Sequence, residues 1–244
     1  MLQKTKGIVL RSVKYGESSL ITTVFTYLYG AQTYMVQGVR SSKVRNNRSG
    51  LLQPATLLDM VVYQNPQRNI QRIKEFQLAY ISNSLQEEVV KNSVALFSVE
   101  LLQRLLPEHA EMPELFDFSF DYFVQLDKTA VGSVANYPLY FIIHCSGVLG
   151  YTLNGEYGEQ TPYLNLAEGG FTSQTPAIRP FVDDEDARTL AALLKVRNLS
   201  DLPSVVMNSA ARFRLLEWYL EFLQRHTQHS GSIRSLAVLQ AVLH

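Results

Sequence analysis

The first 76 residues alternate between hydrophobic and polar positions with the period of two that half-buried β-strands show. Five segments rich in β-branched and aromatic residues are predicted as strands: 7–13, 20–26, 32–39, 57–63 and 69–76. Glycines and the turn at 64–67 separate them. In the fifth segment, strict alternation puts Ile70, Arg72 and Lys74 on the side opposite Gln71, Ile73 and Glu75.

Five short strands in so few residues predict a small barrel. Mixed polarity on the strand faces and a basic composition favour an OB-fold, which binds oligonucleotides across one sheet face and its flanking loops. An SH3-like barrel fits the strand count almost as well and stays open as an alternative.

From about residue 78 the hydrophobic spacing becomes helical. Val94, Phe97, Leu101 and Leu105 recur at intervals of three and four, and Pro107 ends that helix. Further helices are predicted from Pro113 and over 137–149, 187–196, 209–225 and 233–243, with Asp183 as a candidate N-cap. Residues 150–181, rich in Gly and Pro, predict a short hairpin inserted between helices.

The predicted fold class is therefore α+β, with an OB-fold barrel over residues 1–80 and a helical domain over 81–244. The Gly-rich hairpin insertion lies at about 150–181. No stretch of the sequence approaches the roughly 20 apolar residues of a membrane span. With a single cysteine, Cys145, the sequence indicates a soluble, cytoplasmic chain.

A net charge of zero hides a strong division along the chain. Residues 1–80 carry eleven Lys and Arg against three Asp and Glu, a surplus of eight positive charges that residues 81–244 balance. A basic module joined to an acidic remainder indicates a nucleic acid or another anionic surface as the partner of one side.

The most basic segment is 39–49, which holds Arg40, Lys43, Arg45 and Arg48, with no Asp or Glu between residues 18 and 58. A bound polyanion would neutralise this positive charge. The alternative is that the segment is a solvated surface loop. Together with these four, the candidates for phosphate contacts are Arg11 and Lys14, followed by Arg68, Arg72 and Lys74. Candidates for base stacking are Tyr15, Tyr27, Tyr34 and Tyr63, each of which could equally belong to the core.

The sequence contains none of the usual phosphate-loop, dinucleotide, nucleophile-elbow or zinc-protease motifs. His144 and Cys145 are neighbours on one helix, so their side chains project about 100° apart and do not form a base and nucleophile pair. His226 and His229 more often cap a helix end than bind metal. We therefore expect a binding protein without metal, cofactor or small-molecule substrate.

Scattered segments carry a resemblance to a known family. They read Thr-Lys-Gly-Ile-Val-Leu-Arg at 5–11, Tyr-Gly-Glu-Ser-Ser at 15–19, Phe-Thr at 25–26, Gly30, Gln-Gly-Val-Arg at 37–40, Gly-Leu-Leu-Gln-Pro at 50–54, Ala-Arg-Phe-Arg-Leu-Leu at 211–216 and Ser-Ile-Arg-Ser-Leu-Ala-Val-Leu at 232–239. As an ordered set they resemble the bacterial RecO family of recombination mediators.

The resemblance implies binding to single- and double-stranded DNA and annealing of complementary strands. It also implies help from the partner RecR in loading RecA on DNA coated by single-strand binding protein (SSB), near the bacterial nucleoid. The acidic, apolar C-terminal tail of SSB would contact the helical domain, for which Arg212 and Arg214 are candidates. Many members carry a four-cysteine zinc module, and this chain has only Cys145; we expect the hairpin at 150–181 in its place.

Two other classes of function remain alternatives. One is a non-catalytic adaptor whose barrel binds protein. The other is a metal-dependent nuclease that uses the acidic cluster at 183–186, although consecutive residues in a first helical turn point in different directions.

Overall fold

The computed structural model describes residues 1–39, 48–177, 182, 184–227 and 232–243. The strands are β1 Leu2–Tyr15, β2 Ser19–Thr26, β3 Gly30–Val36, β4 Leu57–Tyr63, β5 Ile70–Leu78, β6 Tyr163–Asn165 and β7 Gly170–Thr172. The helices are α1 Val89–Leu105, α2 Pro113–Lys128, α3 Tyr137–Val148, α4 Asp184–Leu194, α5 Ser209–His226 and α6 Ser235–Val242, with 3-10 turns η1 Arg48–Leu52, η2 Val131–Ser133 and η3 Leu199–Ser204.

Two compact units divide the chain. The first combines Met1–Glu88 with Val99–Lys128, and the second combines Val89–Ser98 with Thr129–His244. The first unit therefore holds the barrel together with α2, and the second holds α3 to α6 and the β6–β7 hairpin.

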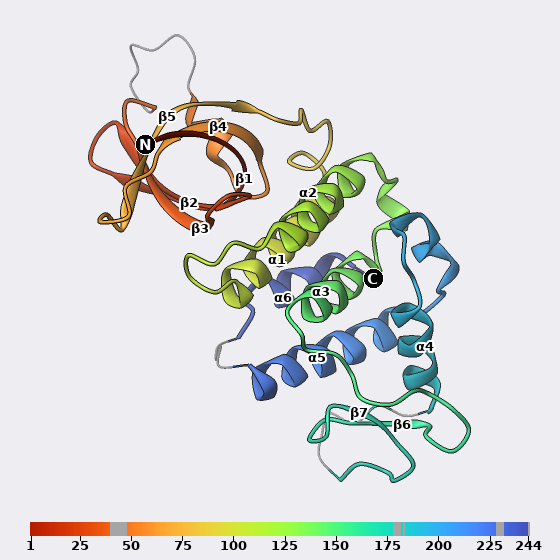
Figure 1. Ribbon diagram of the computed structural model, residues 1–244. Coiled ribbons are helices and arrows are strands. Elements are labelled where there is room, and N and C mark those ends of the chain that lie inside the picture. The colour runs from red at the N-terminus through yellow and green to blue at the C-terminus, as the bar shows by residue number, and fades with distance from the viewer. Residues whose placement is uncertain (40–47, 178–181, 183, 228–231, 244) are drawn as a thin grey trace. The chain divides into compact units, whose positions relative to one another are not determined.

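The five N-terminal strands close into a barrel in the order β1-β2-β3-β5-β4 (Figure 1). Strand β1 is longer than the sequence pattern predicts because its first half pairs with β4 and its second half with β2. All neighbouring strands are antiparallel except β3 and β5, which are parallel. This Greek-key closure is that of an OB-fold, so the predicted barrel is confirmed.

The barrel interior is filled by apolar side chains from every strand. Val9, Val24, Tyr34, Val62 and Phe76 belong to this buried cluster. Inward-facing residues alternate with outward-facing ones along β3, as the strand period requires. The alternation predicted from the sequence thus becomes a closed, filled core.

A β-bulge in β5 corrects one detail of the sequence prediction. Val61 pairs with Glu75 and Val62 with Ile73, so Lys74 has no partner on β4. The extra residue shifts the alternation by one position, and Glu75 becomes exposed instead of sharing the face of Ile73. Strict alternation could not reveal this, because a bulge depends on the partner strand.

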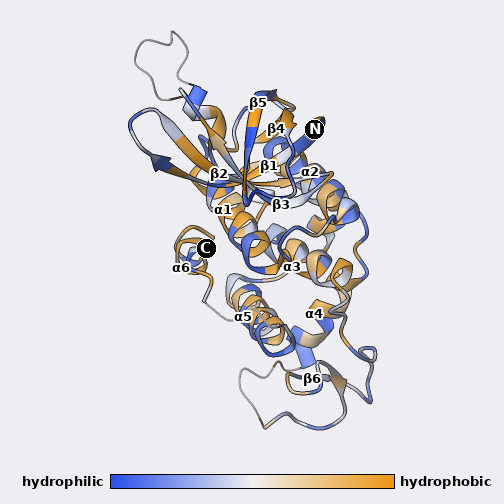
Figure 2. Cartoon of the chain, turned by 60° about the vertical axis from the view of Figure 1, so that its left-hand side comes forward, coloured by the Kyte–Doolittle hydropathy of each residue, from blue (hydrophilic) through white to orange (hydrophobic). Residues whose placement is uncertain are grey.

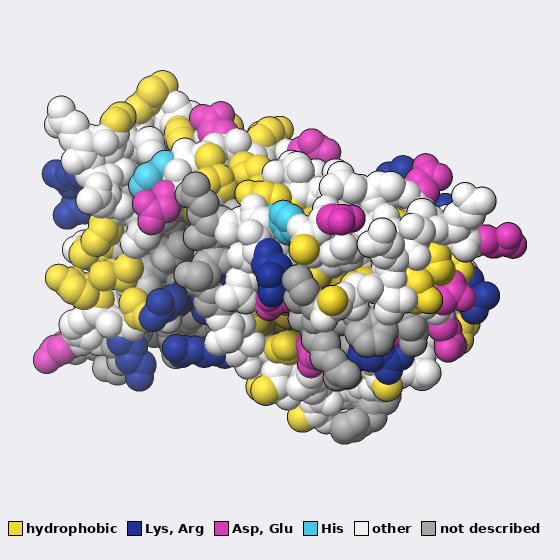
Figure 3. Space-filling model, turned by 90° about the horizontal axis from the view of Figure 1, so that it is seen from below, with side chains coloured by type: hydrophobic (Ala, Val, Ile, Leu, Met, Phe, Trp, Pro, Cys, Tyr) yellow, Lys and Arg dark blue, Asp and Glu magenta, His cyan; other side chains and the backbone are white. Residues whose placement is uncertain are grey.

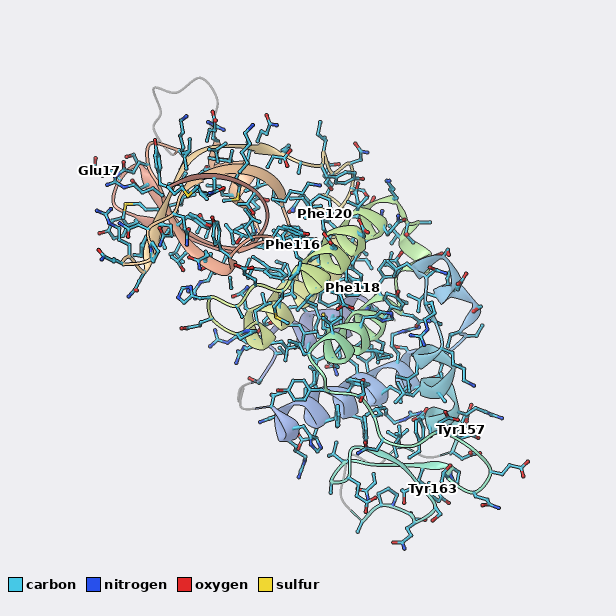
Figure 4. The ribbon with its side chains drawn as sticks, in the orientation of Figure 1. Glu17, Phe116, Phe118, Phe120, Tyr157 and Tyr163 are labelled. Atoms are coloured by element: carbon cyan, nitrogen blue, oxygen red, sulfur yellow. The ribbon has the colours of Figure 1, made fainter. Side chains whose placement is uncertain are left out.

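Helix α2 covers one side of the barrel within the first unit. The ring of Phe116 meets Phe25 of β2 edge-on, with 5.3 Å between the ring centroids, and Figure 4 shows Phe116 on the barrel side of the helix. Ahead of the helix, Gln103 donates a hydrogen bond to the Leu10 carbonyl at 2.9 Å. The many aromatic residues of α2 therefore serve packing, as the sequence indicated.

The segment after the barrel is fastened to α2 by one carboxylate, that of Asp127. It accepts hydrogen bonds from the hydroxyls of Tyr80 and Ser82 and from the backbone amides of Asn83, Ser84 and Leu85, at 2.7–3.0 Å. Although burial opposes the charged form, these hydrogen bonds together hold the pKa of Asp127 well below its ordinary value. A single ionised side chain thus fixes the exit of the chain from the barrel.

The second unit is built around the apolar helix α3 and the buried face of the amphipathic helix α5, whose hydrophobic residues are orange in Figure 2. Trp218 of α5 is fully buried and stacks on Phe222 with 5.7 Å between ring centroids. Asn208 caps α5 by accepting from the Ala211 amide at 2.8 Å. The predicted helical domain and its hairpin insertion are both present. No helix in the described residues combines the length and hydropathy needed to cross a membrane.

Gly169 and Gly170 allow the β6–β7 hairpin to pack closely against the segment that precedes it. The Asn154 carbonyl accepts from the Phe171 amide and the Asn154 amide donates to the Gly169 carbonyl, both at 2.9 Å. A Cβ added at Gly170 would overlap the Asn154 backbone and approach the Asn154 Cβ to 2.7 Å. Main-chain pairing thus holds this insertion to the preceding segment.

We expect Gly170→Ala to destabilise the protein by about 1–3 kcal/mol, because the added methyl forces the hairpin away from Asn154. Thermal unfolding and limited proteolysis of residues 151–177 measure the effect. Gly147→Ala in α3 is the matched control, since nothing lies within 4 Å of an added Cβ there. Equal unfolding temperatures for the two variants would contradict this account of the hairpin.

Candidate nucleic-acid interface

Cross-strand pairing joins five outward-facing residues into one row around the barrel. Val13 pairs with Ile21, Ile21 with Met35, Met35 with Arg72, and Arg72 with Tyr63. Val13 is 39% and Tyr63 48% exposed. We call these five residues the outer row. It presents aliphatic and aromatic surface with one cation and no acid.

A second set of paired positions runs beside the outer row. Arg11 pairs with Thr23, Thr23 with Thr33, and Thr33 with Ile70, which is 41% exposed. Outward-facing residues of neighbouring strands lie about 5 Å apart, within reach of one extended ligand. The two sets together form a face on β1, β2, β3 and β5, extended to β4 by Tyr63, whose charges are all positive and which we call the outer face.

Two turns flank this face. Exposed Tyr15 leads into the β1–β2 turn, which holds Glu17, and exposed Arg68 lies in the β4–β5 turn. In OB-folds, strands 2 and 3 and these two loops form the oligonucleotide site. Figure 3 shows Lys and Arg side chains gathered over the barrel next to hydrophobic ones.

Arg48 is the one residue of the predicted basic segment's four cations that the structure describes. Its guanidinium lies over the Phe76 ring, 4.3 Å from the centroid, and donates to the Phe76 carbonyl. Arg48 is therefore held against β5, near Arg72 and Lys74 of the same strand. Arg40, Lys43 and Arg45 lie outside the described residues.

A groove of about 930 Å³ in the first unit has a different character. Three cations and three acids line it: Lys4, Lys6, Arg48, Asp59, Glu75 and Asp117. Tyr27 lies in this groove, with its ring 5.6 Å from that of Phe116. Two of the three acids of residues 1–80 are therefore in this groove and not on the outer row.

The structure separates the predicted tyrosines. Tyr15 and Tyr63 are exposed at or beside the outer row, and Tyr27 is in the mixed-charge groove. Tyr34 is completely buried in the barrel interior, where burial raises the pKa of its hydroxyl. Base stacking by Tyr34 is therefore a wrong prediction, and the core alternative holds for that residue.

The predicted cations also fall into different places. Arg11 and Arg72 share the outer face, and the bulge exposes Lys74 next to it. Lys14 follows Val13 and so alternates to the other side of β1, at the end of the barrel. Ile21 and Met35 are outward-facing residues that the sequence analysis did not select. Alternation alone places them opposite Thr22 and Tyr34 but does not say which side is buried.

In the second unit the two predicted arginines are already engaged. Arg212 is only 7% exposed and donates to the Asn136 side chain at 2.9 Å, so it is not a surface cation as predicted. Arg214 donates to both carboxylate oxygens of Asp186 at 2.6 and 2.9 Å, while half of its side chain stays exposed. These two arginines of α5, which look like surface cations in the sequence, are therefore a buried side chain and a partner in an ion pair.

The residues of the catalytic alternatives lie in separate surroundings where the structure describes them. Within the described ranges, no three His, Cys, Asp or Glu side chains gather as metal ligands. Asp186 is paired with Arg214; Asp183 and His229 lie outside the described residues. Cys145 is buried, which raises the pKa of its thiol, and the His144 Nδ1 contacts the Tyr140 carbonyl at 3.1 Å.

Known family models and relatives match nearly the whole chain. Residues 1–81 match the family model of the recombination protein O N terminal, and residues 86–236 match that of the recombination protein O C terminal. The chain is similar to DNA repair protein RecO of Bacteroides fragilis, with 31% identity over 98% of both chains. It is also similar to those of Phocaeicola vulgatus, at 29% identity over 98% of both, and Flavobacterium psychrophilum, at 27% over 98% of both. The chain belongs to the RecO family of DNA repair proteins.

Proposed function

We propose that this protein binds DNA through the outer row and its flanking cations and anneals complementary strands without making or breaking covalent bonds. The observation that carries the proposal is the separation of charge on the barrel. Arg11, Arg72 and Lys74 lie on or beside the exposed aliphatic and aromatic surface, whereas Asp59 and Glu75 line the other groove. Cations hold the phosphates, and apolar side chains contact unstacked bases.

Annealing requires two polyanionic strands to approach each other. The Coulomb repulsion between them is reduced when cations from one protein surface screen both backbones. A barrel with eight surplus positive charges in residues 1–80 can supply this screening, and aromatic or aliphatic contacts with bases do not require a particular sequence. We therefore expect binding to be independent of sequence and strongly dependent on salt.

RecR, RecA loading and the SSB tail belong to the same proposal, supported by membership of the RecO family. An acidic, apolar tail needs cations beside apolar surface. In the second unit, a groove of about 490 Å³ offers exposed Arg188 and Lys195 next to Val206, which is 87% exposed, and its lining also holds one acid, Asp201. This groove suits the tail better than Arg212 does, and Arg214 could contact it only in competition with Asp186.

Annealing of complementary oligonucleotides, naked and coated with SSB, tests the proposal. We expect the protein to accelerate annealing of naked strands at low salt and lose this effect as salt rises, because phosphate contacts release counterions. The addition of RecR should extend RecA loading to the coated strands. Absence of annealing under all salt conditions would contradict the proposal.

One observation favours a second candidate, a protein-binding adaptor. The 930 Å³ groove carries charges of both signs, which suits a polypeptide with complementary charges better than a polyanion. A gel shift without any salt-dependent DNA binding, combined with retained binding of RecR, would favour the adaptor.

A further inference from the structure

Strands β3 and β5 leave a pocket beside the outer row. Their parallel pairing ends at Met35 and Arg72, after which β3 leads into Gln37, Gly38 and Val39 while β5 continues through its bulge. The strands separate at this point, and a pocket of about 280 Å³ opens between them. Its volume lies just below the roughly 300–1,000 Å³ typical of ligand pockets, so it suits one small planar group.

The lining of the pocket combines apolar and cationic side chains. Met35, Val39 and Ile73 supply the apolar surface, and Arg48, Arg72 and Lys74 supply the charge. None of its lining residues is acidic. Arg72 and Lys74 take part in none of the ion pairs within the described residues. Three cations around apolar surface match a base with the phosphates on either side of it.

The bulge contributes directly to this arrangement. In a regular strand Arg72 and Lys74 would be separated by one inward residue and each would face a partner on β4. Lys74 is the unpaired residue of the bulge and has no partner residue on β4. Its side chain lines the pocket instead. Arg48 adds a third cation whose position is fixed by Phe76.

We infer that this pocket receives one unpaired nucleobase of a bound DNA strand, with Arg48, Arg72 and Lys74 holding the adjacent phosphates. The inference rests on the proposed function and adds a position at which the strand is fixed. A base within a duplex cannot enter without being unstacked and unpaired, which costs a few kcal/mol. The pocket therefore makes the barrel prefer single strands over duplexes, which general attraction to phosphates would not do.

Two 20-nucleotide strands of equal charge separate base contacts from phosphate contacts. One is oligothymidylate and the other consists of abasic tetrahydrofuran units. We expect the wild-type protein to bind the thymidine strand at least about 5-fold more tightly, since stacking of each base on protein contributes roughly 1–3 kcal/mol. Met35→Ala and Ile73→Ala should each reduce this preference while leaving the salt dependence unchanged, because both residues line the pocket and neither is charged.

Ile81→Ala is the control, since Ile81 is 71% exposed and does not line the pocket. It should keep the full preference. Ile73 also packs against the barrel core, so thermal unfolding checks that variant, and Met35→Ala provides an independent measurement. Equal binding of the two strands by the wild type, or full preference in folded Met35→Ala, would overturn the pocket. Failure to bind either strand would instead overturn the proposed function, and the pocket with it.

Discussion

Replacing Arg11, Arg72 and Lys74 together by alanine is expected to weaken binding to single-stranded DNA about 100-fold at 0.1 M salt. Each phosphate contact on a single strand contributes about 0.7 to the slope of log affinity against log salt, so three lost contacts lower the slope by about 2. Arg11 and Arg72 lie on the outer face, and Lys74 is exposed by the β5 bulge. Fluorescence anisotropy with a labelled oligothymidylate at several salt concentrations measures both quantities.

A charge-matched control distinguishes contact from the general field of the protein. Replacing Arg104, Arg197 and Arg225 by alanine also removes three positive charges, and two of these arginines are paired with Glu100 and Glu221. The control should change the slope by less than about 0.7, the contribution of one contact. Equal losses in the two triple variants would show that Arg11, Arg72 and Lys74 do not form the interface.

Asp127→Asn is expected to destabilise the first unit by about 3 kcal/mol. The buried carboxylate accepts from three backbone amides and from three side-chain hydroxyls. An amide replaces one acceptor oxygen by a donor, so at least two part-buried donors lose this acceptor, and each buried donor left without a partner costs about 1–3 kcal/mol. Denaturant unfolding measures the loss. Asp121→Asn, an exposed carboxylate on the same helix, should stay within about 0.5 kcal/mol of the wild type.

The same residue predicts a pH dependence. Because the folded protein holds the pKa of Asp127 below its unfolded value, the folded state gains stability wherever the carboxylate is ionised. This contribution is fully present above the ordinary carboxyl pKa of about 4 and declines as pH falls below it toward the folded pKa. Asp127→Asn should therefore lose less stability than the wild type between pH 5 and about pH 3. Parallel pH profiles for the two proteins would contradict the role of the ionised carboxylate.

Because the chain belongs to the RecO family of DNA repair proteins, these variants test its role on DNA as well as its folding. The variant with Arg11, Arg72 and Lys74 replaced by alanine should remain folded and fail to anneal strands. The main effect of Asp127→Asn should instead be a loss of folding stability. Normal annealing by this triple variant would favour the mixed-charge groove as the DNA site instead.

Local periodicity determined much of the fold. Alternation with a period of two identified all five barrel strands, and the change to helical spacing near residue 78 marked the region that follows. These signals depend on neighbours along the chain, so they can be read without a structure. The surplus of positive charge in residues 1–80 is likewise a property of composition, and it predicts that the barrel is the part that binds an anionic partner.

The tertiary structure decided which of the selected residues are available to a ligand. Tyr34 and Tyr63 look equivalent in sequence, but barrel closure buries the first and exposes the second. Arg212 and Arg214 are likewise close in sequence, yet one is internal and the other is paired with Asp186. The β5 bulge that exposes Lys74, and the pocket beside it, arise from pairing with strands distant in the chain. Sequence periodicity gives the alternation of faces, whereas only packing between distant segments determines which face is buried.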